Sequence, residues 1–174
     1  TLAPARRDSG AAHPGDHMKY VLLAAMAVAF APIAQAQDCA PLERVLTAAK
    51  DRFKSIMVEQ LDDGYFDASI YFFKADECAV DTIEDQYYCL WARPDVAEAD
   101  KAIAPLYDMA KVCLSEGWVW SELTGVKTGD TTTVTEGYRM TKRSGANKSA
   151  VVQVYMDSIP GQPWRQVWLD VWVE

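Results

Sequence analysis

The sequence has little histidine: only His13 and His17 occur, and both lie before Met18. If the chain is cut before residue 37, no imidazole remains. A Ser–His–Asp or Cys–His arrangement needs that side chain, and so do the zinc-hydrolase ligand sets built on histidine. The sequence therefore excludes these enzyme classes for residues 37–174.

Other motifs that carry chemistry are also missing. No Cys-x-x-Cys pair occurs, and Gly125–Gly129 has neither the length nor the Gly-Lys-Ser/Thr ending of a phosphate-binding loop. No Asp-x-Asp-x-Asp-Gly loop of the kind that binds calcium is present. We find no internal repeat and no linker, and we expect neither a cofactor nor a metal ion.

Long apolar runs are absent except for one near the start of the sequence. Met18-Lys19 is followed by an apolar stretch over residues 20–34 and by the small-x-small site Ala34-Gln35-Ala36. This pattern predicts a secretory signal peptide at residues 18–36, because a membrane span needs about 20 apolar residues. Residues 1–17 show no periodicity and are interpreted as an upstream extension. The sequence thus predicts a single domain at residues 37–174, without a membrane span and located in the periplasm or secreted.

Basic residues are fewer than acidic residues in this sequence. Residues 37–174 contain 14 Lys plus Arg and 23 Asp plus Glu, a net charge of −9. Such an acidic domain repels nucleic-acid phosphates and anionic membrane surfaces, so neither is expected as a partner. A partner with a basic surface is compatible with this charge.

Four cysteines are present, at positions 39, 78, 89 and 113. An even number in an exported chain indicates two disulfides. Cys78 and Cys89 flank an acidic, turn-rich segment and are expected to close a hairpin-like loop, which leaves Cys39 to pair with Cys113. A four-cysteine zinc site is the alternative, but these spacings lack the paired knuckles of such sites.

The periodicity of apolar residues predicts two helices. Apolar side chains recur every three or four positions over residues 40–62, and Asp62-Asp63-Gly64 would end that helix. A second helix follows Asp95, which forms a capping box with Glu98. Pro105 should kink this second helix or mark its true beginning.

The remaining apolar segments are typical of strands. They are expected at residues 69–74, 86–92, 118–123, 131–142, 149–157 and 164–173. The order is then α-β-β-α-β-β-β-β, with turns short enough for antiparallel hairpins. The predicted fold class is α+β, with two helices packed on one face of a mostly antiparallel sheet of about five to six strands.

Carboxylates offer one possible chemistry. They cluster at Asp62, Asp63 and Asp67 and again at Asp76, Glu77, Asp81, Glu84 and Asp85. Paired carboxylates about 5–10 Å apart in a cleft can hydrolyse glycosides. Acidic residues in turns are more often solvated caps and turn formers.

Tryptophan is the more informative residue, since all six lie within residues 37–174. Trp164, Trp168 and Trp172 alternate with aliphatic residues in the last strand and share one face with Gln166 and Asp170. Trp118 and Trp120 likewise share one face of their strand. If the helices cover the aliphatic face, the tryptophans form an outward aromatic platform for a sugar, a peptide or a protein. Burial under the helices and a homodimer contact are the alternatives.

These features favour a non-catalytic binding protein over an enzyme. We expect an inhibitor, an immunity-type protein or a chaperone-like protein that binds an envelope or secreted partner, with Trp118, Trp120, Trp164, Trp168, Trp172 and Asp170 as candidate contacts. A carboxylate-based domain that binds or hydrolyses glycans is the second hypothesis. A carrier of apolar ligands, which needs an internal cavity, is the third.

Overall fold

The computed structural model describes residues 38–127, 133–143 and 148–174. The expected extension (residues 1–17) and signal peptide (residues 18–36) lie outside these ranges. Residues 37–174 group as one compact unit. Within the described residues, no helix has both the length and the apolar character that a bilayer crossing requires.

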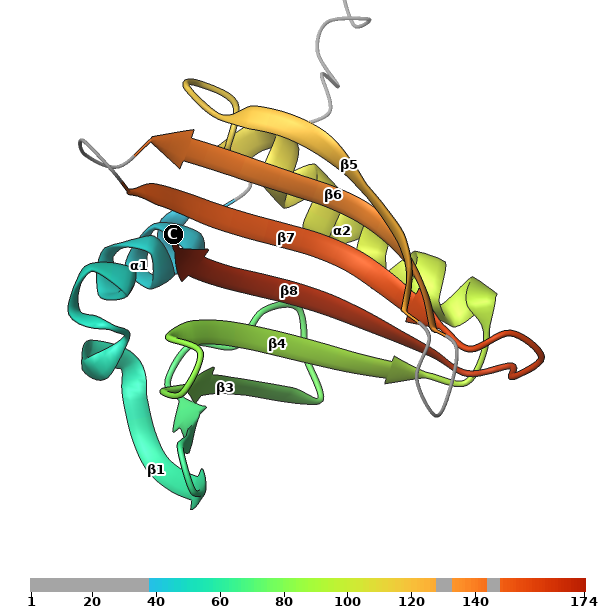
Figure 1. Ribbon diagram of the computed structural model, residues 1–174, viewed down its shortest axis with the longest axis horizontal. Coiled ribbons are helices and arrows are strands. Elements are labelled where there is room, and N and C mark those ends of the chain that lie inside the picture. Colours follow the sequence, from blue (N-terminus) through green and yellow to red (C-terminus); the bar gives the residue numbers. More distant parts are fainter. Residues whose placement is uncertain (1–37, 128–132, 144–147) are drawn as a thin grey trace, which may run out of the picture. The chain divides into compact units, whose positions relative to one another are not determined.

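The fold is α+β, with two α-helices and one antiparallel sheet (Figure 1). The helices are α1 (Ala40–Ala48) and α2 (Val96–Cys113). The strands are β1 (Met57–Asp62), β2 (Tyr65–Ala68), β3 (Glu77–Asp81), β4 (Gln86–Arg93), β5 (Val119–Lys127), β6 (Thr133–Arg143), β7 (Ser149–Ser158) and β8 (Arg165–Val173). The predicted class is therefore confirmed, but the predicted five to six strands are too few. The order among the described residues is α-ββββ-α-ββββ.

The strands lie in the order β1-β2-β3-β4-β8-β7-β6-β5. The first four strands, β1 to β4, run from one edge of the sheet to its centre. After α2, β5 lies at the opposite edge, and β6, β7 and β8 return to the centre. The last strand then closes the sheet by pairing with β4 over eight residue pairs, from Gln86 opposite Trp172 to Arg93 opposite Arg165. Residues from the two halves of the chain consequently become neighbours at the centre of the sheet.

The expected helix over residues 40–62 is wrong beyond Ala48. Arg52 and Phe53 both adopt φ 61°, a left-handed conformation that ends the helical path. The apolar spacing resembled that of a helix because Phe53 and Ile56 are buried in the core. Their backbone, however, forms 3-10 turns and no α-helix.

A hairpin occupies the place of the predicted helix end. Asp62 pairs with Tyr65, so Asp63-Gly64 is a two-residue loop between β1 and β2. Gly64 has φ +86°, which a glycine adopts without strain. An Asp-Gly pair between strand-forming residues is the hairpin signal that would have identified these strands.

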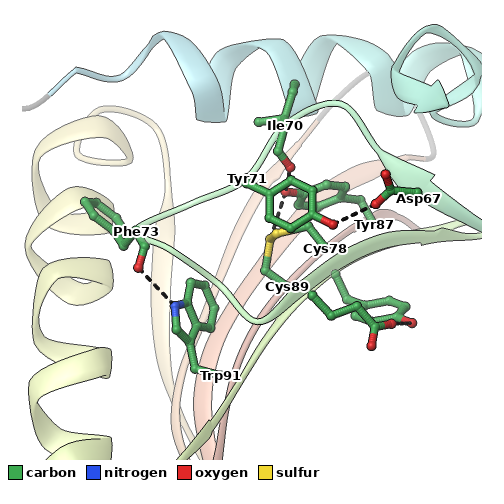
Figure 2. Close-up of a disulfide and its surroundings, with 10 residues drawn as sticks. Asp67, Ile70, Tyr71, Phe73, Cys78, Tyr87, Cys89 and Trp91 are labelled. Atoms are coloured by element: carbon green, nitrogen blue, oxygen red, sulfur yellow. Dashed lines mark hydrogen bonds between the residues drawn. A yellow bond between two sulfur atoms is a disulfide. The ribbon is translucent and has the colours of Figure 1, made fainter.

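The segment predicted as a strand at residues 69–74 is a loop that lies against β4 (Figure 2). The hydroxyl of Tyr87 donates a hydrogen bond to the Ile70 carbonyl over 2.8 Å, and the indole N–H of Trp91 donates to the Phe73 carbonyl over 3.3 Å. Ile70 is 4% exposed. The strand-like pattern thus reflects the alternate burial of Ile70 and Phe72, without the backbone pairing of a strand.

Two disulfides link these elements, and both are the pairs expected from the cysteine spacing. Cys39 and Cys113 join the start of α1 to the end of α2, with Cα atoms 5.5 Å apart. Cys78 and Cys89 lie opposite each other on β3 and β4 and are fully buried. Such bonds are compatible with an extracytoplasmic protein.

α2 begins and continues as its sequence indicates. The Asp95 side chain accepts a hydrogen bond from the Glu98 backbone N–H over 2.9 Å, as a helix cap does. Pro105 lies inside the continuous helix Val96–Cys113 and therefore does not mark its beginning.

The hydrophobic core lies between the helices and one face of the sheet. Both helices contribute to it, and the strand residues in it all point to the same side, among them Tyr87 of β4, Val152 of β7 and Leu169 of β8. We call this side the helix-covered face (Figure 1). On the opposite side, the helix-free face, no described helix packs. On this face Trp168 and Trp172 are half-buried, whereas Asp170 is 5% exposed.

Candidate binding site on the helix-free face of the sheet

Strand alternation and register decide which side chains share the helix-free face. Asp170 of β8 lies between Tyr88 of β4 and Gln153 of β7. Trp168 of β8 lies opposite Tyr155 of β7. Three strands thus bring aromatic, amide and carboxyl side chains together at the middle of the sheet.

Three rings form what we call the aromatic cluster: Tyr88, Tyr155 and Trp168. Trp168 stacks on Tyr155 with an interplanar angle of 13° and 6.3 Å between ring centroids. On β4, Tyr88 is tilted by 57° to Trp168, at 5.9 Å. Such pairs stabilise by about 0.5–1.5 kcal/mol beyond their burial, so the rings hold one another in place.

Trp172 lies on the same face of β8, beyond Asp170 from Trp168. The guanidinium of Arg139 lies 5.2 Å from the centre of its indole ring, a cation–π arrangement. Arg139 also forms an ion pair with Glu174. The Arg139 guanidinium therefore interacts with both the Trp172 ring and the Glu174 carboxylate.

Asp170 is the most enclosed charged side chain of this face, with 5% exposure. Its Oδ2 accepts a hydrogen bond from the Tyr155 hydroxyl over 2.8 Å. Its Oδ1 has no hydrogen-bond partner among the described residues, and neither has the indole N–H of Trp168. A buried polar atom left unpaired costs about 1–3 kcal/mol, and in a folded protein it often marks a functional position.

Burial raises the pKa of Asp170 to about 7, because desolvation disfavours the carboxylate. The Tyr155 hydrogen bond and the nearby Gln86 amide lower this pKa, Asp157 raises it, and Lys127 lowers it. Desolvation prevails, so Asp170 changes its charge near neutral pH. The same desolvation, with Asp170 beside it, raises the pKa of the Tyr155 hydroxyl, which keeps that group a proton donor.

A depression of about 310 Å³ lies next to the aromatic cluster, over β5, β6 and β7. It is lined by Leu123, Thr124, Gly125, Lys127, Thr135, Gln153 and Tyr155. A Cβ at Gly125 would meet no atom within 4 Å, so the missing side chain leaves open space there. The depression thus has an aromatic wall on β7 and polar groups around it.

The structure divides the predicted tryptophan contacts between the two faces. Trp168 and Trp172 lie half-buried on the helix-free face, and Trp164 precedes β8 with 36% exposure. Trp118 and Trp120, in contrast, pack against the core on the helix-covered side. The idea of one surface built from all five indoles is therefore corrected. The physical reason is register, since Trp120 shares its row with Met140, whose side chain is in the core.

Sequence reasoning missed Tyr88, Gln153, Tyr155 and Arg139. Each occupies the alternating position that points away from the core on its own strand. Alternation was visible in the sequence, but the pairing of β4 with β8 was not. The registers of β8 with β4 and β7 show that Tyr88, Gln153 and Tyr155 surround Asp170, and Arg139 of β6 lies over the neighbouring Trp172.

The carboxylates near the turns have structural roles. Asp81 Oδ1 accepts hydrogen bonds from the backbone N–H groups of Ile83 and Glu84. Glu77 accepts one from the Tyr88 hydroxyl over 2.8 Å, and Asp67 one from the Tyr71 hydroxyl over 2.7 Å. In the described part of the chain, no group of three or more His, Cys, Asp or Glu side chains could hold a metal ion.

A larger depression, of about 570 Å³, lies between the turn after α1 and the ends of β7 and β8. Its cations are Lys50, Arg52 and Lys148, all exposed, and Arg52 forms an ion pair with Asp85 at 2.6 Å. The unpaired buried atoms, Asp170 Oδ1 and Trp168 Nε1, belong to residues that line neither depression, but the smaller depression is bounded by Tyr155, which stacks on Trp168 and bonds to Asp170. The helix-free face is the stronger candidate because its polar atoms are both enclosed and unpaired.

No protein-family model matches the chain, and neither a curated protein nor a solved structure matches it.

Proposed function

We propose that residues 37–174 form an exported, non-catalytic binding protein that recognises its partner with the helix-free face of the sheet. The observation that carries this proposal is Asp170, a buried carboxyl group with an unpaired oxygen. It lies among half-buried aromatic rings on a face without a described helix. Aromatic side chains and enclosed polar groups are typical of binding surfaces.

Export is supported by the two disulfides and by the signal-peptide pattern. An inhibitor, an immunity-type protein or a chaperone-like protein of the cell envelope would combine these features. Asp170 receives no catalytic role in this proposal.

Crosslinking and co-purification from envelope extract test the proposal. We expect the protein to retain a partner that is lost when Trp172, on the helix-free face, is changed to alanine. The matched control is the pair Val58→Ser and Leu61→Ser on the edge strand β1, where apolar side chains are 63% and 55% exposed but three strands separate them from β8. A wild-type protein that retains nothing, or a partner kept equally by Trp172→Ala, would contradict the proposal.

A further inference from the structure

The depression over β5, β6 and β7 offers hydrogen-bonding groups that the fold leaves free. The side-chain amide of Gln153 forms no hydrogen bond within the described part of the chain. The Thr135 hydroxyl donates to Asp157, which leaves its oxygen able to accept from a ligand. Gln153 and Thr135 together can both donate to and accept from one small molecule.

The aromatic wall of this depression is fixed in position. Tyr155, which lines the depression from β7, stacks on Trp168 of the neighbouring strand β8. The bond from its hydroxyl to Asp170 restrains the far end of the ring. A ring held at its face and at its tip presents a preorganised apolar surface, which lowers the entropy cost of binding.

The charges around the depression disfavour ionic ligands of either sign. Asp157 is a carboxyl group beside Thr135 on this face, and it would repel a phosphate or carboxylate. Lys127 lines the depression and Arg139 lies on the same face, so an ammonium group would also meet positive charge. A neutral ligand that both donates and accepts hydrogen bonds suits the site better.

The depression has room for such a ligand because the residue that lines it at the middle of its β5 side is Gly125, which has no side chain. Its position is exposed, and a Cβ there would contact nothing within 4 Å. A volume of about 310 Å³ is at the lower end of small-molecule sites. The occupant is therefore small, comparable to one or two rings of an extended molecule.

We propose that this depression binds a neutral saccharide ring, which stacks its C–H face on Tyr155 and places hydroxyls on Gln153 and Thr135. Hydroxyls both donate and accept, which the two side chains require. This inference rests on the proposed function, since it names the ligand class for the same helix-free face. Asp170 is a positioning residue here, because it acts through the Tyr155 hydroxyl.

Titration of the purified protein tests the assignment. Glucose, galactose, N-acetylglucosamine and their disaccharides are added while tryptophan fluorescence and binding heat are recorded. We expect saturable binding of at least one neutral sugar. Affinity should fall at least tenfold in Gly125→Leu, which fills the depression, and in Gln153→Ala, which removes the free amide. Leu61→Ser on β1 should bind as the wild type does.

Several outcomes would overturn the assignment. They are no binding by any neutral sugar, binding that Gly125→Leu and Gln153→Ala leave unchanged, and a preference for glucosamine or glucose 6-phosphate over glucose. Gln153→Ala keeps the test decisive even where Gly125→Leu disturbs the strand. If sugars fail to bind while the Trp172-dependent partner is still retained, the ligand class is wrong and the proposed function stands.

Discussion

The Tyr155 hydroxyl donates a hydrogen bond to Asp170 Oδ2 across 2.8 Å, and this bond joins the aromatic wall of the depression to a buried carboxyl group. The two residues come from neighbouring strands, β7 and β8. Because desolvation raises the pKa of Asp170 to about 7, the bond lies at a group that titrates near neutral pH. The titration of Asp170 therefore makes the free energy of unfolding depend on pH.

The sign of this coupling follows from proton counts. Between the ordinary pKa of 3.8 and the raised value of about 7, Asp170 is ionised in the unfolded chain and protonated in the folded one. The folded state binds more protons, so its stability falls as pH rises through this window and is constant above it. The span corresponds to about 4 kcal/mol at full effect.

Replacing Asp170 with asparagine should remove this dependence. We expect the free energy of unfolding of the wild type, relative to Asp170→Asn, to decline by up to about 4 kcal/mol from about pH 4 to about pH 7. Urea unfolding of both proteins across this range measures it. Tyr155→Phe, which removes a hydrogen bond that lowers the pKa, should extend the decline to higher pH. A constant difference between wild type and Asp170→Asn would refute the coupling.

Gly137 on β6 should not tolerate a side chain. A Cβ there would lie 2.3 Å from the Val154 carbonyl oxygen and 2.5 Å from the Tyr155 Cα, both backbone atoms that cannot rotate away. We expect Gly137→Ala to lose about 1–3 kcal/mol of stability in urea unfolding, as overpacking does. Gly125→Ala is the matched control, since its Cβ would contact nothing within 4 Å. Equal midpoints for the two variants would contradict the close strand approach.

The stability of the protein should depend on the buried hydroxyl of Tyr87, which bonds to the loop over residues 69–76. Tyr87 is fully buried and donates to the Ile70 carbonyl, so Tyr87→Phe leaves that oxygen without its donor. A loss of about 1–3 kcal/mol is expected. Tyr71→Phe removes a similar hydroxyl bond, to Asp67, from a side chain that is 48% exposed, and should change stability little. Thermal unfolding compares the two, and similar shifts would show that burial does not set the cost.

The disulfide between Cys39 and Cys113 should contribute through chain entropy. It spans 74 positions, and a loop of that size corresponds to about 4.5 kcal/mol in the entropy model. The double variant Cys39→Ala, Cys113→Ala should lose a large part of this value in urea unfolding at neutral pH. An unchanged midpoint would mean that the denatured chain is already compact without the bond.

Local sequence patterns predicted the second half of the fold better than the first. The strands β6, β7 and β8 appear within two residues of their expected limits, because long alternating runs between turns allow few other interpretations. The segment from Ala49 to Ala68 was misinterpreted, since residues 53 and 56 are buried at helix-like spacing without a helix. β1 and β2 are six and four residues long, too short to show a period of their own.

The candidate site was predictable only in part. Alternation in β8 placed Trp168, Trp172 and Asp170 on one face, and the structure places their side chains opposite the core. Tyr88 and Tyr155 lie far from them in sequence, and their approach depends on the β4–β8 and β7–β8 registers. No local pattern encodes a register between distant strands, so the convergence on Asp170 required the structure.

The β4–β8 ladder also sets the order in which the domain can become complete. Gln86 and Trp172 are partners across the centre of the sheet, so the first four strands keep an unpaired edge at β4 until the final strand arrives. Contacts of such long sequence separation slow folding, and an open edge invites pairing with other chains. A protein built this way would benefit from a chaperone that shields β4 while the last strand is still missing.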